Sequence, residues 1–263
     1  MAAASESRLR AVAIVPARLG STRLARKMLL RETGHYLFEH TVAGVRRSRR
    51  LEEVVLATDS EEIRAAAREV GVEALLTSPA HASGTDRVHD GFAQLLARGQ
   101  GPYDVVLNVQ GDEPEIRGET LDPLVAAFAD PAVELATLAT PLLDAEEARD
   151  PSVVKVVRDR AGDALYFSRA PIPARAPGAR EGAGPYLRHV GVYAFRPGAL
   201  RRFCALPRGV LEQHESLEQL RWLEAGGKIR VLEAAEGSVG IDTGEQYARF
   251  VARTRARAPQ EIT

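Results

Sequence analysis

Residues 105–114 read VVLNVQGDEP, an apolar run that leads directly into glycine and a carboxylate. The run has no polar alternation, which is typical of a strand covered on both faces of its sheet. Similar apolar runs lie at 12–15 and 54–57. A segment of helical periodicity follows each of the three runs: 38–46 follows 12–15, 61–70 follows 54–57, and 120–128 follows the run that begins at 105. Strands that alternate with helices indicate βαβ units. We therefore expect an α/β fold with three layers and a doubly wound, mostly parallel sheet.

The middle of the chain has a different pattern. Residues 153–157, 164–167 and 190–195 are strand-like but are not separated by clear helices, which predicts a small antiparallel insertion. Between the last two runs, residues 171–185 are rich in Pro, Gly, Ala and Arg and are predicted to form a mobile loop that closes over substrate. We then expect one helix at 211–225, a strand at 230–232 and a closing helix from Glu245 onward.

The sequence shows no internal repeat and no linker between domains. We therefore predict a single domain over residues 11–256, preceded by a flexible segment at 1–10 and followed by a flexible tail at 257–263.

Composition argues against several classes of protein. The 35 basic and 36 acidic side chains nearly cancel, so the chain lacks the positive field that would hold a nucleic acid. The single cysteine, Cys204, rules out an intrachain disulfide and suits a reducing cytoplasm. No apolar run has the length of a membrane span, and the N-terminus does not read as a signal peptide. We expect a cytoplasmic protein that binds neither nucleic acid nor membrane and acts on a small charged substrate.

The first apolar run ends in the loop PARLGSTRLARK, residues 16–27, which is dense in small residues and cations. Small residues let backbone N–H groups approach phosphate oxygens, and Arg or Lys neutralises the remaining charge, so the loop suits a triphosphate. It matches neither the P-loop pattern nor the dinucleotide fingerprint, which disfavours both classes. An ordinary solvated basic turn is the alternative.

Two carboxylates follow apolar runs and could share a magnesium ion. Asp112 comes after Gly111 at the expected carboxyl edge of the sheet, and Asp242 ends the short run at 239–242. Mg²⁺ takes hard oxygen ligands, usually one or two carboxylates together with substrate phosphates. The alternative for each is a helix cap, and it is stronger near Asp242, where Asp242 or Thr243 could begin the last helix.

The segment TSPAHASGTDR, residues 77–87, is a loop that leads into a helix. Ser83, Gly84 and Thr85 offer hydroxyls and accessible backbone to a base or ribose, and Arg87 projects a cation from the first helical turn. We also expect Thr85 and Asp86 to cap this helix.

The second half of the chain carries polar residues of another kind. Arg169 matches a carboxylate, whereas His189, Glu218 and Gln219 suit a row of sugar hydroxyls. Together they describe a polyhydroxylated acid. In the predicted helix at 211–225, Glu212, Glu215 and Gln219 would share one side, and we expect Glu212 and Arg221 to belong to a solvated, ion-paired face.

Taken together, these motifs resemble the CMP-Kdo synthetases, the 3-deoxy-manno-octulosonate cytidylyltransferases. The resemblance spans residues 14–245 in order, and its most specific segments are LNVQGDEP, LYFSRA and LEQLR. The other matching segments are IVPARLGSTRLARK, ATDSEEI, HASGTDR, VKVV, LRHVGVYAFR and VGIDTGE. The family implies a nucleotide-diphospho-sugar transferase-like fold.

The resemblance also implies roles for individual residues. It assigns the CTP phosphates to the loop after the first strand, the nucleotide to two residues of the HASGTDR segment, magnesium to two carboxylates and the sugar acid to six residues. The residues for the CTP phosphates are Ala17, Arg18, Ser21, Arg23 and Lys27, and those for the rest of the nucleotide are Ser83 and Arg87. The magnesium ligands are Asp112 and Asp242. The residues for the sugar acid are Gln110, Arg169, His189, Tyr193, Glu218 and Gln219. Lys27, Arg18, Asp112 and Asp242 would be the catalytic residues. Nucleotide-binding elements would lie mainly in 11–115, and sugar-acid and dimerisation elements of a homodimer mainly in 150–225.

The expected activity is transfer of CMP from CTP to 3-deoxy-D-manno-octulosonate (Kdo), with release of pyrophosphate, for lipopolysaccharide or related polysaccharide synthesis. The alternatives are a CTP-dependent transferase for another acceptor, such as sialic acid or a phosphonate, and a non-catalytic nucleotide-sensing module. One departure concerns the phosphate loop, where the family usually has proline and glycine and this chain has Ala25 and Arg26. We expect altered loop mobility or CTP affinity from this change, because proline restricts the backbone.

Overall fold

The computed structural model describes residues 9–21, 23–142, 144–174, 176 and 186–257. Most of the predicted terminal segment at 1–10, nearly all of the predicted tail at 257–263, and most of the predicted closing loop at 171–185 therefore lie outside the described residues.

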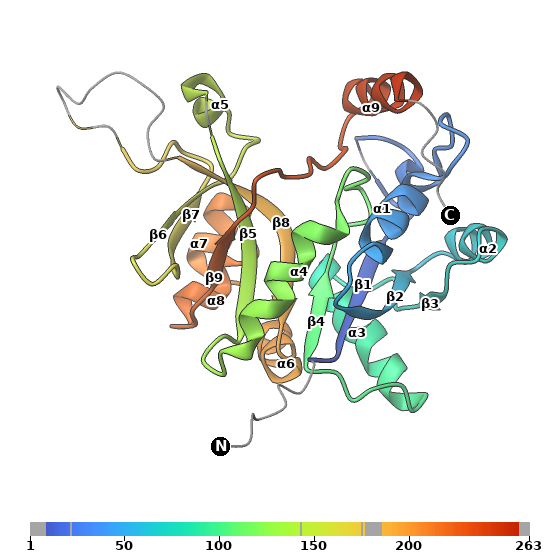
Figure 1. Cartoon of the computed structure of the whole chain (residues 1–263), viewed down its shortest axis with the longest axis horizontal. Helices are drawn as coiled ribbons and strands as arrows, with labels where there is room; N and C mark the ends of the chain where they lie inside the picture. The colour runs from blue at the N-terminus through green and yellow to red at the C-terminus, as the bar shows by residue number, and fades with distance from the viewer. Residues whose placement is uncertain (1–8, 22, 143, 175, 177–185, 258–263) are drawn as a thin grey trace, which may run out of the picture.

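One mixed sheet organises the described part of the chain (Figure 1). Along the sheet the strand order is β3-β2-β1-β4-β8-β5-β9, and β8 alone runs antiparallel to both of its neighbours on this path. The strands on the path are β1 (Ala11–Ala17), β2 (Leu51–Thr58), β3 (Ala74–Leu76), β4 (Val105–Asn108), β5 (Leu135–Pro141), β8 (Leu187–Phe195) and β9 (Arg230–Glu233). The predicted antiparallel insertion is confirmed as β6 (Lys155–Arg158) and β7 (Ala164–Ser168), which pair with each other beside β8.

Helices cover both faces of the sheet, so the predicted three-layer architecture is confirmed. Alternate residues of β1 point to opposite faces: Ala13 and Val15 pack in one apolar cluster, and Val12 and Ile14 in the other. The first cluster includes α1 (Leu37–Arg46), α2 (Glu61–Glu69) and α4 (Gly118–Ala126). The second includes α3 (Gly84–Ala97), α6 (Pro197–Ala205) and α8 (Leu220–Glu224). No helix within the described ranges is both long and apolar enough to span a membrane.

The described part of the chain ends with a long crossing segment and helix α9. After β9, residues 234–243 run back across the carboxyl edge of the sheet to α9 (Gly244–Ala256), which packs on Leu37 of α1 through its own small apolar cluster (Figure 1). This crossing brings the C-terminal part of the chain to the loops that follow β1 and β4, because Ile241 N–H donates to the Asp112 carbonyl at 2.8 Å.

The predicted single helix at 211–225 is wrong. The structure has two short helices, α7 (Val210–Glu215) and α8, separated by a left-handed Ser216 at φ 53° and ψ 45°. Arg169 explains the break, since its Nε donates to the Glu215 carbonyl at 2.8 Å, in place of the helical amide that would otherwise bind that oxygen.

Candidate active site

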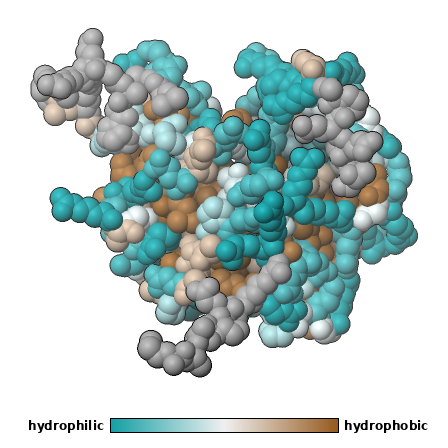
Figure 2. All heavy atoms as spheres, viewed as in Figure 1, coloured by the Kyte–Doolittle hydropathy of each residue, from teal (hydrophilic) through white to brown (hydrophobic). Residues whose placement is uncertain are grey.

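A polar cavity of about 300 Å³ lies at the carboxyl edge of the parallel strands. This is where an α/β sheet with right-handed connections collects the residues that follow its strands. At this edge the molecule is hollowed between α5 (Ala145–Arg149) and α9 (Figure 2). The lining residues come from four segments of the chain: Pro16, Arg18, Ser21, Arg23, Lys27 and Met28; His81, Ala82, Ser83, Gly84 and Arg87; Gln110, Gly111 and Asp112; and Asp242.

Nine of the predicted site residues meet in this cavity, among them both predicted magnesium ligands and four of the five predicted phosphate-binding residues. Ala17, the fifth, is fully buried at the end of β1 and does not line the cavity. The predicted sugar-acid residues other than Gln110 do not line this cavity.

Lys27 is the central cation of the site. Its side chain is buried, and its Nζ lies 2.5 Å from Asp112 Oδ2 and 3.2 Å from Asp242 Oδ1. Arg23 adds a second cation, 3.0 Å from Asp242 Oδ1. The two carboxylates therefore converge on one position, which the ammonium group of Lys27 occupies.

Local structure leaves both carboxylates available to a ligand. Thr243 caps α9 with its own side chain, and α4 begins only at Gly118, so neither Asp242 nor Asp112 caps a helix. Gly111 allows the turn before Asp112 because a Cβ there would lie 2.9 Å from the Pro16 carbonyl oxygen. The helix-cap alternative is thus excluded for both side chains.

The residues present fit a magnesium ion. The described residues contain no cluster of three or more His, Cys, Asp or Glu side chains that could hold a metal. Two convergent carboxylates are nevertheless the usual protein contribution to a magnesium site that also takes phosphate oxygens from a nucleotide. The contacts of Lys27 demonstrate that a cation can reach both carboxylates at once.

The unusual Arg26 does not add charge to the cavity. Its guanidinium forms an ion pair with Glu62 on α2, and its backbone adopts a left-handed conformation at φ 53°. L-residues rarely adopt this conformation, which glycine tolerates at no steric cost.

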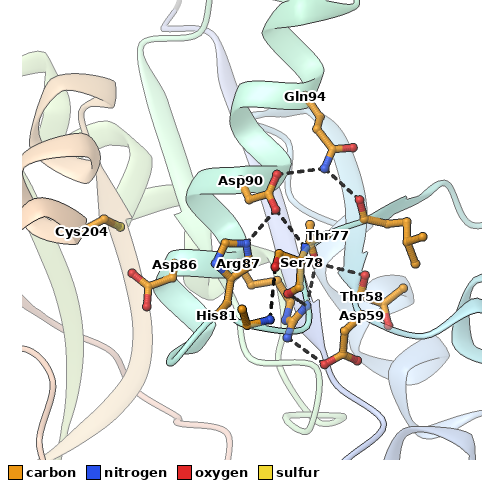
Figure 3. Close-up of polar contacts among 12 residues, drawn as sticks. Thr58, Asp59, Thr77, Ser78, His81, Asp86, Arg87, Asp90, Gln94 and Cys204 are labelled. Carbon is orange, nitrogen blue, oxygen red and sulfur yellow. Dashed lines mark hydrogen bonds and ion pairs between the residues drawn. The ribbon is translucent and has the colours of Figure 1, made fainter.

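Arg87 has a structural partner that the sequence did not predict. It is almost fully buried, and Nη2 donates to Asp59 Oδ2 at 2.9 Å while Nη1 donates to Thr77 Oγ1 at 2.6 Å (Figure 3). Asp59 also accepts the Leu19 N–H of the phosphate loop at 3.3 Å. Asp59 therefore connects Arg87 of α3 to the phosphate loop through hydrogen bonds. Asp59 directly follows β2, so the signal that identified Asp112, a carboxylate after an apolar strand, would also have identified Asp59.

A hydrogen-bonded chain leads from the cavity toward the second half of the protein. Gln110 donates to Asn108 at 2.9 Å, Asn108 donates to Thr85 at 3.2 Å, and Thr85 donates to Glu218 at 2.7 Å. The prediction that Thr85 caps α3 is wrong, since Ser83 is the cap and Asp86 completes the capping box.

Glu218 and Gln219 have polar atoms left for a ligand. Gln219 Nε2 and Glu218 Oε1 are buried and make no hydrogen bond with the described residues, although Arg221 lies 3.6 Å from Glu218 Oε1. Burial raises the pKa of Glu218. Unpaired buried polar atoms cost free energy, and binding of a polar ligand would recover it.

His189 and Tyr193 complete this second group as uncharged partners. Their rings lie 5.4 Å apart, and His189 Nε2 lies 3.0 Å from Thr137 Oγ1. Burial lowers the pKa of His189 to about 3 and raises the pKa of Tyr193 well above its ordinary value. Both side chains are therefore neutral near pH 7 and suit hydroxyl groups.

One expectation for the second half needs correction, and one predicted residue has partners that the sequence did not predict. The guanidinium of Arg169 donates to the backbone carbonyls of Glu215, Pro151 and Ser216. Glu212 and Arg221 do not form a solvated face: both side chains are 7% exposed and pair with each other through two hydrogen bonds of 2.6 and 2.7 Å. The broken helix turns these residues inward.

The chain is similar to known proteins over nearly its whole length. The cytidylyltransferase family model matches residues 12–229. A 3-deoxy-manno-octulosonate cytidylyltransferase of Anaeromyxobacter sp. strain Fw109-5 is 48% identical over 241 residues, covering 91% of this chain and 95% of that protein. The enzyme of the same name from Bdellovibrio bacteriovorus is 42% identical over 248 residues, covering 92% and 96%.

Solved structures agree with the sequence relatives. A CMP:2-keto-3-deoxy-manno-octonic acid synthetase complexed with CTP matches with a TM-score of 0.87 and 38% identity, covering 95% of this chain and 100% of that chain. A 4-diphosphocytidyl-2C-methyl-D-erythritol synthase from Anaerococcus prevotii has a TM-score of 0.60 at 14% identity, covering 95% of this chain and 100% of that chain, and shares the fold. The chain therefore belongs to the 3-deoxy-manno-octulosonate cytidylyltransferase family.

Proposed function

We propose that this protein transfers CMP from CTP to Kdo and releases pyrophosphate. The observation that carries the proposal is the cavity in which Lys27 joins the carboxylates of Asp112 and Asp242 beside the cations of the phosphate loop. Cations and a two-carboxylate metal site are what a nucleoside triphosphate requires. The relatives at 42–48% identity carry the name of this activity, and the similar solved structure at 38% identity holds CTP.

The reaction needs positioning and neutralisation of charge more than covalent help from the protein. The anomeric hydroxyl of Kdo attacks the α-phosphorus of CTP, a new P–O bond forms, and the bond to pyrophosphate breaks. Lys27 and Arg18 neutralise charge on the departing phosphates. Asp112 and Asp242 would hold Mg²⁺, which polarises the α-phosphate and lowers the pKa of the attacking hydroxyl.

The acceptor would lie against Gln110, Tyr193, His189, Glu218 and Gln219. In support, Gln110 lines the nucleotide cavity and is joined to Glu218 by a chain of hydrogen bonds through Asn108 and Thr85. Arg169 would be a positioning residue, which acts through the backbone of the acceptor site. It fixes the backbone at Glu215 and Ser216, immediately before the Glu218 and Gln219 pair.

We further propose a cytoplasmic homodimer that supplies CMP-Kdo to lipopolysaccharide or related polysaccharide synthesis. Exposed apolar side chains in the second half support an interface there: Leu165 is 63% and Val210 77% exposed, and Leu211 lies beside Val210. Covering such side chains with a partner subunit would remove apolar surface from water, which favours association. Sedimentation of the purified protein, compared with a Leu165→Glu, Val210→Glu double variant, would test the dimer.

Pyrophosphate release tests the activity directly. Incubation with CTP and Mg²⁺ should release pyrophosphate rapidly with Kdo and far more slowly with sialic acid or a phosphonate. A preference for one of these other acceptors would replace Kdo but keep the transferase. No release with any acceptor, together with intact CTP binding, would favour the nucleotide-sensing alternative.

A further inference from the structure

His81 lines the nucleotide cavity but belongs neither to the phosphate-binding loop nor to the carboxylate pair. It lies in the loop between β3 and α3, and its side chain is 24% exposed. The inference below rests on the proposed use of CTP and concerns which nucleobase the cavity accepts.

Asp90 fixes which nitrogen of His81 carries the proton. His81 Nε2 lies 2.7 Å from Asp90 Oδ2, and the same carboxylate accepts the Ser78 N–H at 3.1 Å and the Gln94 amide at 2.9 Å (Figure 3). These hydrogen bonds lower the pKa of Asp90 against the opposing effect of its burial, so the carboxylate is an acceptor. An acceptor at this distance requires a proton on Nε2.

The other ring nitrogen is consequently an acceptor when the ring is neutral. His81 Nδ1 makes no hydrogen bond with the described residues, and His81 is a lining residue of the cavity. The Asp90 contact therefore leaves Nδ1 as the polar atom that the ring can offer to a ligand.

The chemistry of the surrounding segment points to a base rather than a phosphate. The phosphate-type groups of the cavity are Arg18, Arg23 and Lys27, all from the loop after β1. The segment at 81–84 contributes no cation, and the guanidinium of nearby Arg87 is engaged by Asp59. A ring nitrogen that accepts a hydrogen bond and has no neighbouring free cation suits an N–H donor.

We propose that His81, held by Asp90, selects cytosine over uracil by accepting a hydrogen bond from the exocyclic amino group. Cytosine carries an amino donor at the position where uracil carries a carbonyl acceptor. With UTP, two acceptors would face each other across the cavity, and the unpaired groups would weaken binding.

Nucleotide binding measured by calorimetry, without an acceptor sugar, separates this inference from the transfer reaction. His81→Phe fills similar space but has no acceptor nitrogen, so the CTP-over-UTP affinity ratio should fall about tenfold or more, mainly through weaker CTP binding. Asp90→Ala frees the ring and should lower the same ratio. Gln94→Ala is the matched control, because it removes another contact of Asp90 from the same helix and should leave the ratio unchanged.

An unchanged ratio in folded His81→Phe would overturn the assignment of His81 while leaving the transferase intact. If Asp90→Ala fails to fold, the result with His81→Phe still decides the question, because the His81 side chain is partly exposed. Wild-type protein that binds neither CTP nor UTP would overturn the proposed function and this inference together.

Discussion

At the scale of single residues, Lys27 has the most constrained charge in the site. Its ammonium contacts both Asp112 and Asp242 and is the only buried member of the phosphate-loop cations that line the described cavity. Lys27→Met should lower the rate of pyrophosphate release about 100-fold or more, because charge on the leaving group would lose its neutralising partner. Arg26→Met is the control, since Arg26 faces Glu62, and it should reduce the rate far less.

Asp112 provides the complementary prediction. Asp112→Asn should fold normally, since the amide keeps the side-chain volume, but it should lose most turnover and weaken Mn²⁺ binding measured by electron paramagnetic resonance. Glu115→Gln is a control three residues along the same turn, where the carboxylate pairs with Arg253. Turnover near the wild-type rate in Asp112→Asn would contradict the metal assignment.

Arg26 allows the cost of a left-handed residue to be measured. Arg26→Gly and Arg26→Ala both remove the ion pair with Glu62, but only glycine relieves the strain at φ 53°. We expect the glycine variant to have a free energy of unfolding about 1 kcal/mol greater than the alanine variant, measured by urea denaturation. Equal stabilities would mean that the loop adjusts to relieve the strain.

At the scale of elements, the junction between α7 and α8 depends on a buried ion pair. Glu212→Gln would leave Arg221 with an uncompensated buried charge, so unfolding by urea should show a loss of about 3 kcal/mol. The control is Arg208→Ala, which removes an exposed cation 3.7 Å from the same carboxylate and should cost less than about 1 kcal/mol. Similar losses in the two variants would show that burial of the pair does not matter.

The same junction shows what sequence periodicity can and cannot predict. The apolar runs that became β1, β2 and β4 were predictable, because a strand buried on both faces needs continuous apolar residues. The run at 211–225 has helical periodicity, but contacts from Arg169 to the carbonyls of Glu215 and Ser216 end the first helix. Arg169, which lies 46 residues before Glu215 in the sequence, thus decides where the helix ends. The helix propensity of residues 211–225 does not reveal this contact.

At the scale of the whole molecule, the site depends on the crossing segment that returns Asp242 to the edge of the sheet. The place of Asp112 was predictable, since it lies after β4 and residues that follow parallel strands gather at one edge. The apolar run at 239–241 forms no strand, so this rule does not explain why Asp242 meets Asp112. The partners of Arg87 and Arg169 were not predictable, because a sequence shows that a cation is present but not which acceptor it meets. For that reason the nucleotide side was predicted more fully than the acceptor side.

Global stability should depend on pH through two partly buried histidines. Burial lowers the pKa of His189 to about 3 and that of His40 to about 4, against an ordinary value of 6.5. The unfolded chain therefore takes up protons near pH 6.5 that the folded protein cannot accept until the pH is much lower. Stability should fall as the pH decreases from about 6.5 toward 3, because the unfolded state binds more protons in this window.

Urea unfolding at pH 7 and pH 5 measures this dependence. Replacement of His40 by Phe removes one of the two groups and keeps an aromatic ring against Phe250, whose centroid lies 5.1 Å from that of His40. The loss of stability between pH 7 and pH 5 should therefore be smaller in His40→Phe than in the wild type. An identical loss in the two proteins would show that His40 does not contribute to the acid sensitivity of the fold, and would leave it to His189 and the carboxylates.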